Sequence, residues 1–327
     1  MNASAPTYAE EVNWTRLGKA PCLFLALGYG GTLAALPMLA FQDRENYLGY
    51  ARHSLLLLGK FFLSGISATI ANEPVWLLVN GVLGLMLSPE VVVRLLIFTS
   101  ACAMSYVMLR RGAERGWGWM LLLLLMPQLV ENYTTHITQG CAIAVFLAGW
   151  FSVSKFPRWL LLGLAPLIHS SYFVVLALYV MTETMKKLRL AEDVQVAAIV
   201  ATGAVMSVGF VWAASVLGAR QGTEYQDVAG ASVSGIGFVF WLLVLLLLFL
   251  EGRSLLRRNA LAVTALVFYL ATYFFLQFTG RIFESMMALA IVAGLQLTSW
   301  RRAIFLLLSV SWLIAGWILE LTQVRSL

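Results

Sequence analysis

RWLLLGLAPLIHSSYFVVLALYVMT, residues 158–182, is an apolar stretch with polar side chains in its middle. One membrane-spanning helix takes about 20 residues, so the stretch is too long for a single span. Pro166 interrupts helical hydrogen bonding, and His169, Ser170 and Ser171 follow it closely. We therefore predict two short helices that meet at a polar elbow, where the side chains can satisfy freed backbone groups.

The composition of the whole chain extends this interpretation. Of its 327 residues, 61% are hydrophobic and 12% are charged, and the mean hydropathy is +0.84. A soluble domain carries about 25% charged residues, so lipid is the expected solvent. We predict an all-α, polytopic integral membrane protein, a single domain over residues 1–327, with about eleven to thirteen transmembrane or re-entrant helices. Apolar segments are expected at 22–40, 73–87, 91–109, 117–130, 137–153, 194–218, 236–250, 259–278, 283–298 and 303–319.

Basic residues set the expected orientation, because cytoplasmic loops are enriched in Lys and Arg. Five short clusters can all be cytoplasmic if residues 158–182 go out and return, which also accounts for most of the net charge of +6 without a nucleic-acid partner. His169 then lies on the outer face with loops 131–136, 219–235 and 279–283. The clusters are Arg110, Arg111 and Arg115; Lys155 and Arg158; Lys186, Lys187 and Arg189; Arg253, Arg257 and Arg258; Arg301 and Arg302.

The placement of residues 54–71 is left open by the sequence. They either cross or re-enter the membrane, or form an amphipathic helix on its outer surface after Asp43–Arg52. The run 22–40 is expected to be an uncleaved first helix, because it is long and lacks a cleavage site. The three cysteines lie in or against apolar runs without metal-ligand spacing, so we expect no metal site.

Two residues are candidate catalytic groups. His169 could remove a proton from a hydroxyl group, or it could hydrogen-bond the backbone freed by the elbow. Glu73 precedes Pro74 at the start of an apolar segment, so it could be a buried carboxylate base or a simple helix cap.

Cations on the expected outer face are candidate ligands of an anion, because positive charge is normally avoided there. Arg281 could grip phosphate oxygens bidentately, or pair internally with Glu284. Arg220 opens a polar loop that contains Tyr225 and that suits sugar or phosphate, although a solvated loop has the same composition.

The segment after the first apolar run is also dense in polar and aromatic groups. Asp43, Arg44 and Tyr47 could contact a sugar or its phosphate, or could belong to an interfacial belt. Elsewhere there is no Walker loop, no HxxxH or CxxC spacing, no GxSxG elbow and no DxD-type pair. A nucleotide- or metal-driven mechanism is therefore not expected.

Several short motifs follow one another in a fixed order along the chain. They are Asp43 with Asn46-Tyr47 and Tyr50; Glu73-Pro74-Val75-Trp76-Leu77-Leu78; Gln139-Gly140-Cys141-Ala142; Leu167-Ile168-His169-Ser170-Ser171; and Arg281-Ile282. In this order they resemble the EpsG-like family of Wzy-type polysaccharide polymerases over about Asp43 to Arg281. The family usually has Arg before the Gln-Gly-Ala stretch, whereas Thr138 stands here and His136 lies two residues earlier.

This resemblance implies a metal-independent, cofactor-free membrane glycosyltransferase of the GT-C-like type in the bacterial inner membrane. Its donor and acceptor would be undecaprenyl-pyrophosphate-linked oligosaccharides, joined on the periplasmic face for O-antigen or exopolysaccharide synthesis. His169 or Glu73 would accept the proton, and Arg281, helped by Arg220 or Arg44, would hold pyrophosphate. The resemblance adds Gln139 and His136 to the substrate site. A chain-length regulator and a flippase are candidate partners.

Three rival functions use similar chemistry. A flippase or transporter of lipid-linked oligosaccharide also needs intramembrane cations, but it would more often show internal repeats, and none is visible. An O-antigen ligase would use the same donor with a lipid A core acceptor. A membrane acyltransferase is a more distant alternative that would also use a lone histidine.

Overall fold

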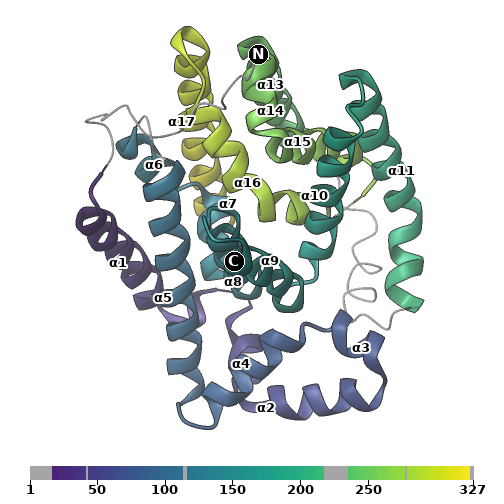
Figure 1. The fold of residues 1–327 in the computed structure, drawn as a ribbon. Helices are drawn as coiled ribbons and strands as arrows, with labels where there is room; N and C mark the ends of the chain where they lie inside the picture. The colour runs from purple at the N-terminus through teal and green to yellow at the C-terminus, as the bar shows by residue number, and fades with distance from the viewer. Residues whose placement is uncertain (1–16, 42, 113–115, 217–234, 277, 325–327) are drawn as a thin grey trace.

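The computed structural model describes residues 17–41, 43–112, 116–216, 235–276 and 278–324 (Figure 1). Every regular element within these ranges is helical, which confirms the all-α prediction. The first half contains α1 (Lys19–Ala35), η1 (Met38–Ala40), α2 (Arg44–Leu63), α3 (Ile66–Ala71), α4 (Pro74–Gly84), α5 (Pro89–Val107), the π-helical turn η2 (Met108–Gly112), α6 (Trp117–Leu123), α7 (Pro127–Thr134) and α8 (Ile137–Trp150). The second half contains α9 (Lys155–Ile168), α10 (Ser171–Lys187), α11 (Glu192–Val216), α13 (Ile236–Glu251), α14 (Arg253–Arg258), α15 (Ala260–Thr272), α16 (Thr279–Leu295) and α17 (Ser299–Val324).

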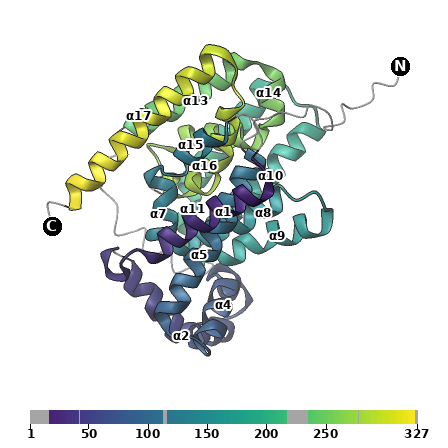
Figure 2. The ribbon, with the colours of Figure 1, turned by 90° about the vertical axis from the view of Figure 1, so that its left-hand side faces the viewer.

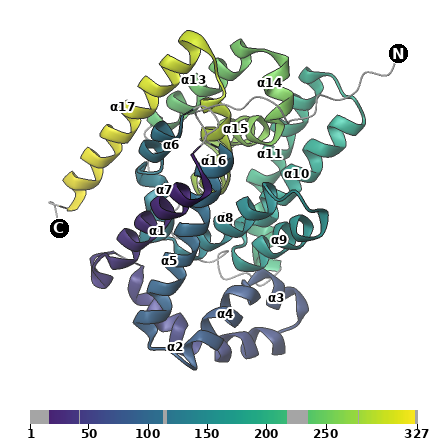
Figure 3. The same ribbon diagram turned by 60° about the vertical axis from the view of Figure 1, so that its left-hand side comes forward.

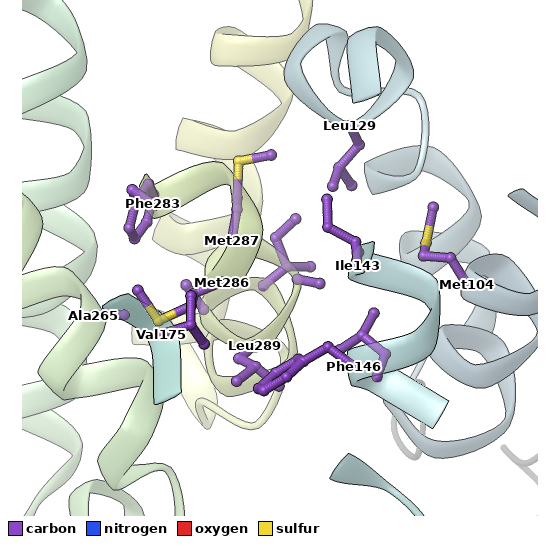
Figure 4. Packing of buried hydrophobic residues seen from close by; sticks show 14 of the residues in the cluster. Met104, Leu129, Ile143, Phe146, Val175, Ala265, Phe283, Met286, Met287 and Leu289 are labelled. Atoms are coloured by element: carbon purple, nitrogen blue, oxygen red, sulfur yellow. The ribbon is translucent and has the colours of Figure 1, made fainter. Parts of the chain in front are cut away.

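The core of the protein is built around α5, α8 and α16. α5 packs against α1 and α8, whereas α16 packs against α10 and α15. From Ile282 to Leu295 nearly every side chain of α16 is buried, so this helix has no outward face along most of its length. Figure 4 shows Met286 and Leu289 of α16 in the same packed cluster as Phe146 of α8. α5, α8 and α16 therefore form the packed centre of the molecule, and the shorter helices surround it.

The elbow predicted for residues 158–182 is present. α9 ends at Ile168 and α10 begins at Ser171, and the backbone of His169 between them is extended. Pro166 lies inside the last turn of α9, where its ring removes a helical hydrogen bond.

Proline interrupts two other predicted segments. Residues 117–130 do not form one helix, since α6 ends at Leu123 and α7 begins at Pro127. The first helix stops at Ala35 rather than 40, because Pro37 disfavours helical geometry at Leu36, whose ψ is 149°.

The segment left open by the sequence folds as α2, a turn and α3. In Figure 1, α2 lies across the bottom of the molecule, below the upright helices α5 and α11. It packs closely on α4. A Cβ added at Gly84 of α4 would collide with the carbonyl oxygen of Ala51 in α2. At Gly65, φ is 113°, a left-handed value that glycine adopts without strain, and the chain turns there into α3.

Several of the basic clusters gather at one end of the molecule. In Figure 1, α14 lies at the top and α2, α3 and α4 lie at the bottom, and Figures 2 and 3 show the same heights. Lys186, Arg189 and Arg257 line one cavity at the α14 end. Arg301 joins them there, since its Nε donates to Glu251 Oε2 at 2.7 Å, beside α14. Three of the five basic clusters therefore gather opposite α2.

By length and hydropathy, two described helices could cross a membrane: Pro89–Arg110 and Ser299–Leu319. In the second of these helices, only 11% of the most apolar 18-residue stretch is buried inside the protein. Five further apolar helices of 10–17 residues are shorter than a full span. The difference from the eleven to thirteen predicted segments arises partly because prolines and the elbow divide long apolar runs into shorter helices.

Candidate active site

A cavity of about 620 Å³ opens at the α2 end of the molecule. Its wall comes from α2, the segment before α4, the α7–α8 turn, the α9–α10 elbow and the first turn of α16. All three histidines of the sequence line it. The lining residues are Asp43, Asn46, Tyr47, Gly49, Tyr50, His53, Leu57, Glu73, His136, Thr138, Gln139, His169 and Arg281. The fold thus collects residues that are far apart in sequence and that were singled out as candidate site residues.

Glu73 and His169 form a buried pair on one wall. His169 Nδ1 lies 2.8 Å from Glu73 Oε1, and the backbone N–H of Ser170 donates to the same oxygen at 3.4 Å. The two side chains are only 13% and 4% exposed. When Nδ1–H donates to the carboxylate, Nε2 keeps a free lone pair and can accept a proton.

The backbone at Glu73 is strained. Its φ is 58° and its ψ is 55°, a left-handed conformation that is uncommon for a residue with a side chain. A residue before proline is normally extended, so Pro74 adds to the cost. Such strain costs on the order of 1–3 kcal/mol and persists where the surrounding structure enforces it. Here it aims the carboxylate at the elbow rather than at the α4 backbone, since Glu73 makes no side-chain cap hydrogen bond.

Arg281 lies in the first turn of α16, and its side chain is exposed at the cavity. Among the described residues it forms no ion pair within 4 Å. The internal pair with Glu284 is not formed, and Glu284 Oε2 is buried without a hydrogen-bond partner in the described part of the chain. A guanidinium in this position, beside the positive end of a helix, suits an anion.

Gln139 fixes the position of that helix end. Its Nε2 donates to the carbonyl oxygen of Arg281 at 2.7 Å and to Ser285 Oγ at 3.1 Å. Ser285 Oγ also lies 2.9 Å from Ser171 Oγ, and Tyr172 Oη donates to the Ser285 carbonyl at 2.9 Å. These bonds tie α8, the start of α10 and α16 together, so Arg281 is held at a fixed distance from the elbow.

His136 lies in the turn between α7 and α8, where it precedes the first residue of α8. Its Nδ1 is 3.8 Å from Asp43 Oδ2, which favours the protonated ring, yet burial and the neighbouring Arg281 and His169 side chains outweigh this. The pKa of His136 is lowered to about 4, so the imidazole is neutral at pH 7. It can therefore accept a hydrogen bond from a hydroxyl group.

Aromatic rings form another part of the wall. Tyr47 and Tyr50 meet Trp76 edge-on, with ring centroids 5.8 and 6.4 Å away, and Tyr47 Oη accepts a hydrogen bond from Thr138 Oγ1 at 3.4 Å. Aromatic rings and hydroxyl groups therefore lie side by side in this part of the wall.

Arg44 departs from the prediction of a substrate ligand. Its side chain is fully buried, and it does not line the cavity. Its Nε donates to the Thr134 carbonyl at 2.6 Å, and its guanidinium lies over the Phe41 ring. Arg44 therefore anchors the start of α2 to the end of α7. Arg220 and Tyr225 lie outside the described residues.

Several lining residues were not proposed as site residues from sequence, and His53 is the most notable. Asn46, Tyr50, His53 and Leu57 are spaced four, three and four residues apart, which places them on one face of α2. That spacing is visible in the sequence once residues 44–63 are taken as one helix. Among the described residues no three His, Cys, Asp or Glu side chains form a metal-binding group.

No protein-family model, curated protein or solved structure matches this chain.

Proposed function

We propose that the chain is a polytopic membrane protein and that its cavity opens on the periplasmic side. Many large apolar side chains are exposed, among them Phe24, Leu63 and Ile66, at 76–89% of their full accessibility. A water-soluble surface rarely tolerates this, whereas lipid solvates such side chains. The basic clusters at the α14 end belong in the cytoplasm by the positive-inside rule, and the cavity lies at the opposite end. α2 would then rest on the outer membrane–water interface.

The proposed activity is that of a Wzy-type polymerase in the bacterial inner membrane, which joins undecaprenyl-pyrophosphate-linked oligosaccharide repeat units. One observation carries this proposal: a single cavity combines a buried carboxylate–imidazole pair with an arginine that has no ion-pair partner among the described residues. The first can remove a proton and the second can hold a phosphate. Transfer of a glycan from a pyrophosphate needs both a group that accepts the proton of the attacking hydroxyl and a cation that binds the departing pyrophosphate.

In the proposed reaction, a hydroxyl oxygen of the acceptor repeat unit attacks the anomeric carbon of the donor glycan. A new glycosidic C–O bond forms while the bond between that carbon and the pyrophosphate oxygen breaks. His169 Nε2 takes the hydroxyl proton, and Glu73 stabilises the imidazolium that results. Undecaprenyl pyrophosphate leaves with the bonding electron pair.

Arg281 would neutralise the charge that develops on the departing pyrophosphate, and the N–H groups at the start of α16 would assist it. Gln139 is a positioning residue, because it bonds the Arg281 backbone rather than a reacting atom. Asp43, Tyr47 and neutral His136 would bind sugar hydroxyl groups. Since the leaving group is already activated, the proposed reaction consumes no nucleotide and uses no metal.

The test is polymerisation by purified protein. The chain in detergent receives one lipid-linked repeat unit from the source organism, with a chelator present, and products are separated by size. The proposal expects a ladder from the wild type, loss of at least 100-fold in rate for His169→Ala and Arg281→Ala, and a normal rate for the surface variant Arg258→Ala. Wild-type rates in both cavity variants would refute the assignment.

The same assay separates the rival functions. A flippase would move the repeat unit across a liposome membrane without forming a bond. An O-antigen ligase would form product only when a lipid A core is supplied, and an acyltransferase would require an acyl donor.

A further inference from the structure

A second cavity, of about 570 Å³, lies at the α14 end, where α10, α11, α14 and α15 approach one another. Three of its lining residues are cations: Lys186, Arg189 and Arg257. Most of the remaining wall is apolar, with Val196 and Phe249 as examples. A cavity with cations and an apolar wall fits a molecule that has an anionic head and a hydrocarbon tail.

The apolar wall continues beyond this cavity. Val196 and Phe249 also line an adjoining, more open hollow of about 640 Å³, which runs along α11 past Val200, Ala201 and Ala204. Small side chains at the last two positions leave room for a chain of methylene groups beside the helix. The cationic cavity and this apolar hollow therefore share two lining residues and are continuous.

Acidic side chains that the structure describes near this site leave two of its three cations without an ion pair. Lys186 Nζ is paired with Glu183 Oε1 at 2.7 Å, and Asp193 lines the outer hollow. Arg189 and Arg257, in contrast, form no ion pair with any residue whose side chain the structure describes. Two guanidinium groups remain available for a bidentate anion such as phosphate.

The backbone at Arg189 is a second sign of a specific role. It closes α10 with φ at 52°, a left-handed position where glycine is the usual residue. The N–H groups of Arg189 and Leu190 bond back to Lys186 and Met185 at 3.1 and 3.2 Å. The arginine is thereby fixed at the cavity wall, at a cost that glycine would avoid.

We propose that this site binds an anionic diacyl phospholipid of the leaflet at the α14 end. Its phosphate lies between Arg189 and Arg257, and one acyl chain follows α11 along Ala201. This site shares no lining residue with the first cavity and does not depend on the polymerase chemistry.

The experiment measures lipid-dependent stability of the full chain in detergent. The melting temperature is titrated with phosphatidylglycerol, with phosphatidylcholine and with inorganic phosphate, and the apparent affinity follows from the concentration dependence. The double variant Arg189→Gln/Arg257→Gln should bind phosphatidylglycerol about 30-fold more weakly, at about 5-fold for each lost cation. The matched control is Lys187→Gln/Arg258→Gln, which removes the two neighbouring exposed cations outside the cavity and should bind within threefold of wild type.

A second variant, in the apolar hollow, keeps the proposal testable if the double variant does not fold. Ala201→Trp keeps every cation and fills the hollow, so it should also weaken phosphatidylglycerol binding. Equal stabilisation by phosphatidylcholine would exclude headgroup recognition, and equal stabilisation by inorganic phosphate would exclude a lipid. If the double variant and its control lost the same affinity for phosphatidylglycerol, the binding would depend only on the total surface charge. Each of these three results would overturn the proposal.

Discussion

Glu73→Gln isolates the contribution of charge in the Glu73–His169 pair. The amide keeps the size of the carboxylate, and its oxygen can still accept from His169 Nδ1 at 2.8 Å, but the negative charge is lost. Two unit charges about 4 Å apart interact by about 4 kcal/mol at an effective dielectric constant of about 20. The pair is nearly closed to solvent, at 13% and 4% exposure, so screening is weak.

If the imidazolium is half to fully formed in the transition state, the variant loses about 2–4 kcal/mol there. The expected result is a fall in kcat of about 30- to 1,000-fold at about 1.4 kcal/mol per tenfold, with a donor KM within about threefold of wild type. The assay is the initial rate of glycan elongation by purified protein over a range of donor concentrations.

The matched control is Glu90→Gln, which removes an exposed carboxylate paired with Arg94 on α5, away from the cavity. It should leave kcat and KM unchanged. Circular dichroism and the melting temperature show whether Glu73→Gln is folded. A folded Glu73→Gln protein with a kcat within threefold of wild type would refute the proposed role of the pair, and so would a loss confined to KM.

Three further predictions concern the same end of the molecule. Arg44→Ala should lower the free energy of unfolding by about 2–4 kcal/mol without changing the donor KM, because it leaves a cavity and a carbonyl without its hydrogen-bond donor. Arg281→Lys should instead raise the donor KM about tenfold with an unchanged melting temperature. The opposite pair of results would exchange the roles of the two arginines. His136 has a pKa of about 4 in the folded chain against about 6.5 unfolded, so the unfolded state takes up the proton first and stability should fall by about 3 kcal/mol from pH 6.5 to pH 4; thermal melts of His136→Gln should lack this slope, and an identical slope would contradict the assignment. Gly84→Ala should lower the melting temperature, since its Cβ would meet the backbone of Ala51, and an unchanged value would show that α2 can shift away from α4.

Much of the fold was predictable because apolar periodicity and proline are local signals. The elbow at His169 follows from Pro166 and two serines, and the structure places it as predicted. The break before Pro127 was missed, although proline at the first position of α7 is itself a start signal. An apolar run hides such a break, because hydropathy does not register a missing backbone donor.

The candidate site was predictable in its membership more than in its geometry. Glu73 and His169 are 96 residues apart, and no sequence pattern indicates that they touch. The burial of Arg44 could not be predicted, because its guanidinium bonds the carbonyl of Thr134, which is distant in sequence. His53 was missed because residues 44–63 were divided between a polar loop and an apolar segment rather than taken as one helix.

The most direct test of the proposed function is reconstitution of the wild-type chain in liposomes with one purified undecaprenyl-pyrophosphate-linked repeat unit and no nucleotide. We predict a ladder of lipid-linked glycans that grows by one repeat unit per step, with release of undecaprenyl pyrophosphate in equal amount to the bonds formed. Transfer of the repeat unit across the bilayer without elongation, or elongation only onto a lipid A core, would contradict it.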